Sequence, residues 1–331
     1  MSTADLASRS GQDLETRQLA RWWAVDLLLA TFLVGTALFV LVFRDRVPGA
    51  GWVALGHLAA WGLFLTVKRT ASREPRLRLL YLFLPYGIVV GIFEALGFII
   101  PYVRAAAVES LAGDAVLARA DLALFGSDPT RWFDGLLGPA STTILQICYT
   151  TYYFLPLLLG VVLVRRGKLR TALSYVGAIV GCFLTTYVGY YLVPAYGPRL
   201  FYIYESALPM SGLAAWVYGA IDALDNIALN AFPSGHTAVT LLCLYLLWRE
   251  SWRLALAVLP ICLGLVVSTI ALRYHYAVDV LAGLLVAAGW ACAGLPAVLR
   301  HDAGCAASTG EPAPAQGQGF RALEENLPPS A

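Results

Sequence analysis

Two motifs in this chain combine a histidine with residues that could act on a phosphate group. The first is Pro-Ser-Gly-His at 233–236, and the second is Arg-Tyr-His-Tyr-Ala-Val-Asp at 273–279. The chain has four histidines, and two of them lie in these motifs. Each motif borders an apolar stretch, where polar groups can meet water instead of hydrocarbon. This placement indicates phosphate chemistry at a membrane surface.

The second motif has the residue types of a nucleophile and its partner. His275 and Asp279 are four residues apart, which puts them on one face of a helix. A carboxylate that accepts one imidazole N–H leaves the lone pair of the other ring nitrogen free to attack phosphorus. Arg273 lies just ahead and could clamp the same phosphate. The structural alternative is an aspartate that caps a helix and pairs with a neighbouring histidine or arginine.

The first motif combines helix-start residues with a proton donor. Pro233 and Ser234 favour a helix N-terminus, whose unpaired backbone N–H groups attract anions. Gly235 lets a phosphate approach the backbone closely. His236, on the same turn, could protonate a departing oxygen near neutral pH.

An arginine follows a turn-forming segment, Pro-Ala-Tyr-Gly-Pro-Arg at 194–199. Glycine and proline hold the backbone in a defined turn, so the guanidinium of Arg199 can point steadily at one place. That planar, permanently charged group matches phosphate oxygens. The structural alternative is an arginine that reaches lipid head groups. Its position ahead of the Ser-Gly-His turn favours a phosphate-binding role.

The composition is that of a membrane protein. Apolar residues make up 59% of the chain and charged residues 13%, which is too apolar for a soluble domain. A helix needs about 20 apolar residues to cross the hydrocarbon of a bilayer. We therefore expect an all-α, polytopic membrane helix bundle of about eight transmembrane helices. The expected spans are 22–43, 50–67, 79–101, 140–164, 171–193, 236–248, 254–272 and 276–299.

These spans divide the chain into five parts. We expect a cytoplasmic amino-terminal segment (1–21), three transmembrane helices (22–103), an interfacial amphipathic segment (104–139), a catalytic transmembrane core (140–300) and a disordered tail (301–331). The interfacial segment is either a lid over the site or a plain connector. The tail is rich in Ala, Gly, Pro, Gln and Ser and cannot bury enough apolar surface to fold.

The basic residues predict an orientation, because cytoplasmic loops are enriched in Lys and Arg. With both termini in the cytoplasm, the inner loops hold most of these residues and both histidine motifs face outward. We expect an integral protein of a bacterial plasma membrane, with its site facing the periplasm or the exterior. The inner-loop residues are Lys68, Arg69, Arg73, Arg76, Arg78, Arg165, Arg166, Lys168, Arg170, Arg249 and Arg253.

Taken together, the motifs resemble the type 2 phosphatidic acid phosphatase superfamily, and within it the branch that resembles inositol phosphorylceramide synthase. The resemblance covers about residues 120 to 295. It is carried by Pro-Ser-Gly-His at 233–236, by the pattern closed by His275 and Asp279, by Gly-Pro-Arg at 197–199, and by Asp-Leu-Ala-Leu-Phe-Gly at 121–126. It implies a core of about six helices and an inositolphosphotransferase-like activity.

The resemblance also implies metal-free phosphoryl transfer. His275 would form a phosphohistidine, Asp279 would orient it, and His236 would protonate the leaving alcohol. The phosphoryl oxygens would be held by Arg199, Arg273, Ser234 and the Gly235 amide. Two departures favour the synthase-like branch over ordinary phosphatases: no Lys lies near Gly-Pro-Arg, and the usual Ser-Arg ahead of the nucleophile is replaced by Ser268 and Thr269.

Several alternatives stay open at this point. The acceptor of the phosphoryl group is either water, in a phosphatase, or a polyol or lipid alcohol, in a transferase. A metallohydrolase that uses the two histidines and Asp279 as ligands, and a lipid transporter or scramblase, are other readings. We expect a membrane lipid as substrate, no cofactor, no metal and no nucleic acid; the oligomeric state is left open. For Glu94, within the third span, a structural partner such as a tyrosine competes with a role in the site.

Overall fold

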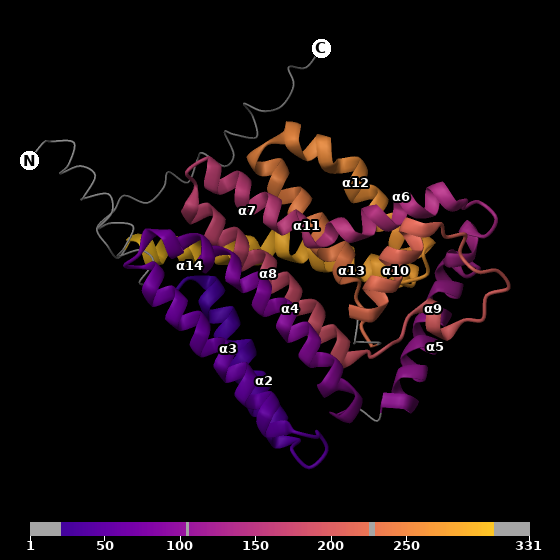
Figure 1. Ribbon diagram of the computed structural model, residues 1–331, viewed down its shortest axis with the longest axis horizontal. Coiled ribbons are helices and arrows are strands. Elements are labelled where there is room, and N and C mark those ends of the chain that lie inside the picture. Colours follow the sequence, from indigo (N-terminus) through magenta and orange to yellow (C-terminus); the bar gives the residue numbers. More distant parts are fainter. Residues whose placement is uncertain (1–20, 104–105, 225–228, 308–331) are drawn as a thin grey trace, which may run out of the picture.

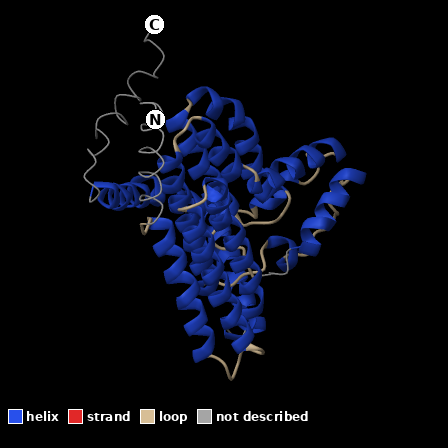
Figure 2. Cartoon of the chain, turned by 60° about the vertical axis from the view of Figure 1, so that its left-hand side comes forward, coloured by secondary structure: helices blue, strands red, loops and turns tan. Residues whose placement is uncertain are grey.

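The computed structural model describes residues 21–103, 106–224 and 229–307. Throughout these ranges the regular structure is helical and no strand occurs, as Figure 2 shows. The expected all-α, polytopic membrane bundle is therefore confirmed. Our expectations for residues 1–20 and 308–331 lie outside the described residues.

Three long apolar helices precede the rest of the fold. They are α2 (Ala24–Val42), α3 (Ala50–Ala71) and α4 (Arg78–Val103), with a 3-10 turn, η1 (Pro75–Leu77), before α4. In Figure 1 the indigo helices α2 and α3 pack side by side along one flank of the molecule. All three are long and apolar enough to cross a membrane.

A shorter arm follows the third helix and leaves the bundle. It consists of α5 (Ala106–Phe125) and the 3-10 turn η2 (Pro129–Phe133). Gly126, with φ of +73°, ends the helix, and Asp128 caps η2 by accepting the Thr130 N–H. Figure 1 places α5 beside α9, away from α2 and α3. In the part of the chain that is described, α5 is not among the helices that could span a membrane.

The expected fourth span, 140–164, is broken into two helices. α6 (Pro139–Thr150) and the 3-10 turn η3 (Thr151–Tyr153) meet α7 (Leu155–Arg165) at an angle of 53°. Pro156 lies in the first turn of α7, where its missing N–H costs nothing, but it cannot continue the hydrogen bonding of a helix that arrives from before it. The expected span at 140–164 therefore corresponds to a bent pair of helices.

The remaining helices form the centre of the bundle. α8 (Leu169–Leu192) is the most buried of the apolar helices. A long loop with the short helices α9 (Pro198–Phe201) and α10 (Gly212–Leu224) leads to α11 (Gly235–Glu250). Helix α12 (Trp252–Ala271) follows α11 and forms a helical hairpin with it. The last span comprises α13 (Ala277–Gly289), the π-helical turn η4 (Trp290–Gly294) and α14 (Leu295–Ala307).

The number of spans is close to the expected eight. Among the described residues, six helices are long and apolar enough to cross a membrane, and the bent pair α6 and α7 makes a seventh if it counts as one span. The expected span at 236–248 corresponds to α11, whose 16 residues fall short of the length a full crossing needs. The last helix runs to Ala307, so the tail begins later than the expected residue 301.

A buried polar network explains why the last helix continues. Asp302 accepts the Ala24 N–H at 2.8 Å and the Ser174 hydroxyl at 2.6 Å, which joins α14 to α2 and α8. Close by, Asp26 pairs with Lys68 and accepts the Tyr81 hydroxyl at 2.7 Å. The network ties five helices together at the end of the bundle where the basic loops lie.

Replacing Lys68 by alanine is expected to lower the free energy of unfolding by about 3–5 kcal/mol, because it leaves the charge of Asp26 buried without its partner. Chemical unfolding of the purified protein in detergent would measure this loss. Arg69→Ala is the matched control, since Arg69 is the exposed neighbour on the same turn. Equal stability of the two variants would contradict the assignment.

Candidate active site

His275 lies in the short loop between α12 and α13 and is 4% exposed. Its Nδ1 is 2.8 Å from the carbonyl oxygen of Ala231 and 3.5 Å from Oδ2 of Asp279. A carbonyl oxygen can only accept, so Nδ1 carries the proton and Nε2 keeps its lone pair. The orientation expected from Asp279 is therefore supplied first by a closer group, Ala231, for which the sequence carried no signal.

Asp279 is fully buried at the start of α13. Its Oδ2 accepts the Tyr276 N–H at 2.9 Å, so the same carboxylate caps the helix and lies beside His275. Its own carbonyl oxygen accepts the Ser234 N–H at 3.0 Å, which joins the two histidine motifs directly. A Cβ on Gly283 would lie 2.5 Å from the Ser234 carbonyl oxygen, so only glycine permits this approach of α13 to α11.

His236 lies in the first turn of α11 and is held between two aromatic rings. Its ring centroid is 4.2 Å from that of Tyr149 and 4.1 Å from that of Tyr152. Tyr149 lies in α6 and Tyr152 in η3, just before the bend between η3 and α7. The centroids of His236 and His275 are 5.9 Å apart. The residues just before the bend thus hold the His236 ring between two aromatic rings.

Ser234 and Gly235 occupy the positions expected of an anion-binding helix start. The Ser234 hydroxyl accepts the Thr237 N–H at 3.3 Å and caps α11. The next N–H groups belong to the first turn, where a helix offers no acceptor of its own. A Cβ on Gly235 would lie 2.8 Å from the Tyr190 hydroxyl, so the glycine keeps this backbone closely approachable.

Arg199 is brought to the same place by its backbone. Its N–H donates to the carbonyl oxygen of Arg273 at 2.9 Å. Gly197 has φ of +88°, and a Cβ there would lie 2.6 Å from the Tyr274 carbonyl oxygen, so the turn requires glycine. The Arg199 guanidinium carbon lies 5.1 Å from the centroid of the Tyr274 ring. The loop thus carries its arginine to the edge of the histidine pair.

Arg273 lies elsewhere than expected. Its Nη2 is 2.8 Å from Asp134 Oδ1, its Nη1 donates to the Ser206 carbonyl oxygen at 2.9 Å, and its guanidinium carbon lies 3.7 Å from the centroid of the Tyr204 ring. The Asp134 side chain and the Ser206 backbone, both outside the long helices, thus bind this guanidinium. The geometry gives no support to direct phosphate binding by Arg273.

A cavity of about 260 Å³ brings three predicted residues together: His275, His236 and Arg199 all line it. Glu94 of α4 lines it too, so this carboxylate within a span reaches the site. Several tyrosines also lie on its wall. The other lining residues are Tyr86, Val90, Phe93, Tyr149, Tyr152, Tyr153, Pro156, Phe183, Tyr187, Tyr190, Tyr196, Asn230 and Tyr274.

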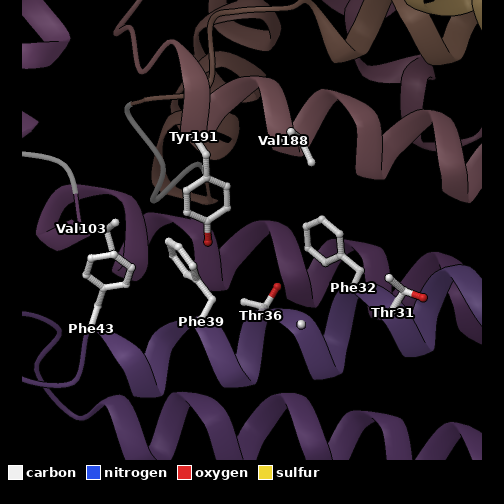
Figure 3. Close-up of a pocket in the computed structure, with 9 residues that line it drawn as sticks. Thr31, Phe32, Thr36, Phe39, Phe43, Val103, Val188 and Tyr191 are labelled. Atoms are coloured by element: carbon white, nitrogen blue, oxygen red, sulfur yellow. The ribbon is translucent and has the colours of Figure 1, made fainter.

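A larger groove of about 510 Å³ lies between α2, the end of α4 and α8. Figure 3 shows Phe39 of α2 opposite Tyr191 of α8, with Phe32 on one side and Phe43, the residue after α2, on the other. Its walls hold no histidine, carboxylate or basic side chain. Size therefore does not identify the site, and the smaller cavity with the histidine pair is the candidate.

The described residues contain no group of three or more His, Cys, Asp or Glu side chains arranged to hold a metal ion. The two histidines and Asp279 do not form such a group. The metallohydrolase alternative thus lacks a ligand set within this part of the chain.

A helical membrane bundle with two histidines, a buried aspartate and an arginine at one end defines a membrane phosphatase-like protein. The family profile described as the PAP2 superfamily matches residues 117–293, more than half of the chain. The chain belongs to this superfamily, which confirms the resemblance seen in its motifs. The narrower branch, similar to inositol phosphorylceramide synthase, stays a prediction.

One relative is a PA-phosphatase related-family protein of Dictyostelium discoideum. It is 26% identical over 179 residues, which cover 46% of this chain and 32% of that protein. The match thus spans about a third of the relative's length. No solved structure matches the chain.

Proposed function

We propose that this protein transfers a phosphoryl group from a membrane phospholipid or lipid phosphate through a phosphohistidine on His275. The observation that carries the proposal is the hydrogen bond from His275 Nδ1 to the Ala231 carbonyl. It leaves Nε2 unprotonated in a residue that lines the same cavity as His236 and Arg199. A nucleophile, an acid and a phosphate-binding cation then surround one reacting phosphorus.

In the first step, Nε2 of His275 attacks phosphorus and a P–N bond forms. The bond from phosphorus to the lipid alcohol breaks, and His236 gives its proton to the departing oxygen. Arg199, Ser234 and the Gly235 amide stabilise the charge on the phosphoryl oxygens. Since Arg273 is engaged by Asp134 and Ser206, we assign it to positioning the loop of Arg199, to which its carbonyl oxygen is bonded.

In the second step, water or another alcohol attacks the phosphohistidine, its proton passes to His236, and the P–N bond breaks. This step decides between a phosphatase and a transferase. Glu94 and the tyrosines of the cavity wall offer hydroxyl and carboxylate groups that a polyhydroxylated acceptor would bind. This lining favours a transferase similar to an inositolphosphotransferase; a lipid phosphate phosphatase is the alternative.

The distribution of basic residues over the fold supports the orientation that we propose. Lys168 pairs with Glu250 at 2.7 Å at the end of the bundle opposite to the histidine motifs, and the basic loop residues lie at that end. By the bias of Lys and Arg towards the cytoplasm, this end faces inward. We propose, on this charge bias, that the active site opens to the periplasm or the exterior of a bacterial plasma membrane.

The decisive experiment gives the purified protein phosphate-labelled phosphatidylinositol, phosphatidic acid or a polyprenyl diphosphate, with and without an alcohol acceptor. We expect the label to appear in a new phosphate ester of the acceptor only when an acceptor such as inositol or a lipid alcohol is present, and to do so in EDTA as well. Free phosphate without any acceptor would establish the phosphatase instead. No turnover of any substrate would contradict both and favour a transporter.

A further inference from the structure

The arm between the third and fourth spans carries two buried carboxylates on one face. Asp114 and Asp121 of α5 are 0% and 1% exposed. They are seven residues apart, close to two helical turns, so both point the same way. Helix α5 contacts α9 and α13, the elements next to Arg199 and His275. The arm is therefore docked against the outer face of the active site.

Asp114 binds the turn that carries Arg199. Its Oδ2 accepts the Tyr196 N–H at 2.8 Å, and its Oδ1 accepts the Gly197 N–H at 2.9 Å and the Tyr276 hydroxyl at 2.9 Å. A Cβ on Gly113 would lie 2.2 Å from the Pro194 carbonyl oxygen, so α5 can approach this turn only with glycine here. Arg199 follows two residues after the amides that Asp114 holds.

Asp121 binds the start of the helix that follows His275. Its two oxygens accept the N–H groups of Ala277 at 2.9 Å and Val278 at 2.8 Å. Asp279 takes the N–H of Tyr276, so the first amides of α13 are all engaged by carboxylates of the protein. This helix start is thereby closed to phosphate, which leaves the start of α11 as the place for the anion.

The hydrogen bonds explain how Asp114 and Asp121 can be buried as carboxylates. Burial raises the pKa of both Asp114 and Asp121, and the backbone N–H groups that they accept oppose that rise. Each carboxylate thus depends on its two amides, and each pair of amides depends on the carboxylate. The contacts reach across 82 and 156 residues of sequence.

We propose that Asp114 and Asp121 are positioning residues that hold the Arg199 turn and His275 at the spacing that phosphoryl transfer requires. One helix grips both, at points about 10 Å apart along its axis. A reacting group displaced by about 1 Å can cost about a hundredfold in rate. The proposal rests on the proposed function and gives the arm a role that neither a lid nor a plain connector would have.

The test uses Asp114→Asn and Asp121→Asn in the full chain. Asparagine keeps the shape of aspartate but turns an NH₂ group towards one of the two amide donors, so one bond of each pair is lost. Asp45→Asn is the matched control, because this exposed carboxylate lies in the loop between α2 and α3 and pairs only weakly with Arg44 at 3.9 Å.

Hydrogen exchange measured by mass spectrometry tests the hydrogen bonds from the backbone amides to Asp114 and Asp121, and it needs no substrate. Asp114→Asn should speed exchange about tenfold or more at the amides of Tyr196 and Gly197, and Asp121→Asn should do so at those of Ala277 and Val278. The control should change neither segment. Unchanged exchange at these amides, or faster exchange throughout the protein, would overturn the proposal.

Kinetics then separate positioning from folding. Both variants should lower kcat about 10- to 100-fold while KM changes less than about threefold and the midpoint of thermal unfolding stays near that of the parent. Faster local exchange with unchanged kcat would overturn the positioning role. A parent protein that turns over no lipid would sink the proposed function, and the exchange data would still decide whether the two aspartates hold these segments.

Discussion

Replacing His275 by alanine is expected to abolish lipid turnover, with a loss of at least about 10⁴-fold in kcat, because the nucleophile that forms the covalent intermediate is gone. The loop should keep its fold, since Ala231 and Asp279 retain backbone partners that do not involve the imidazole. Label transfer from phosphate-labelled lipid measures the loss. The parent enzyme, quenched during turnover, should carry acid-labile label on the protein, and the variant should carry none.

The control for this variant is His57→Ala. His57 is also a buried histidine, and its Nδ1 also lies 2.8 Å from a backbone carbonyl oxygen, that of Val53, but it is on α3 and does not line the cavity. Its replacement should leave turnover within about twofold of the parent. Residual turnover in His275→Ala, at a rate similar to that of the control, would rule out the phosphohistidine.

Replacing His236 by alanine should produce a loss that depends on the leaving group. With a lipid alcohol, a poor leaving group that needs protonation, kcat/KM should fall about 10²- to 10⁴-fold. With a nitrophenyl phosphate, whose phenolate departs without a proton, the loss should stay below about tenfold. The ratio of the two losses, measured on one preparation, is its own control against misfolding.

The same variant distinguishes whether His236 acts as an acid or only packs between two tyrosine rings. If His236 only filled the space between Tyr149 and Tyr152, its loss would disturb the site for every substrate alike. An equal fall with both leaving groups would therefore contradict the assignment of His236 as the acid. It would leave His275 as the nucleophile and move the search for the proton donor to the tyrosines of the cavity wall.

Much of the site was predictable because its key residues are local in sequence. His275 and Asp279 lie one helical turn apart, and Ser234 and Gly235 directly precede His236. All eight expected spans coincide with helices of the described residues, and seven of these are long and apolar enough to cross a bilayer if the bent pair counts as one. These features depend on neighbouring residues, so they can be read without knowing how distant segments meet.

Other features arise only when distant segments pack together. The Ala231 carbonyl replaces Asp279 as the nearest partner of His275 Nδ1, and Asp134 takes the guanidinium expected to bind phosphate. A backbone carbonyl has no signature in a sequence, and the partner of a long arginine side chain depends on which loop folds over it. The bend between η3 and α7, which the hydropathy of the span does not indicate, likewise follows directly after the tyrosine that packs against His236.

The sequence by itself determined that this is an all-α membrane protein with two histidine motifs in the order of its superfamily, because hydropathy and short motifs are local properties of the chain. The tertiary structure decided which groups surround His275 and His236 and which backbone amides Asp114 and Asp121 bind. Hydrogen bonds that link residues 82 and 156 positions apart follow from the packing of helices, and the residue types alone do not specify that packing.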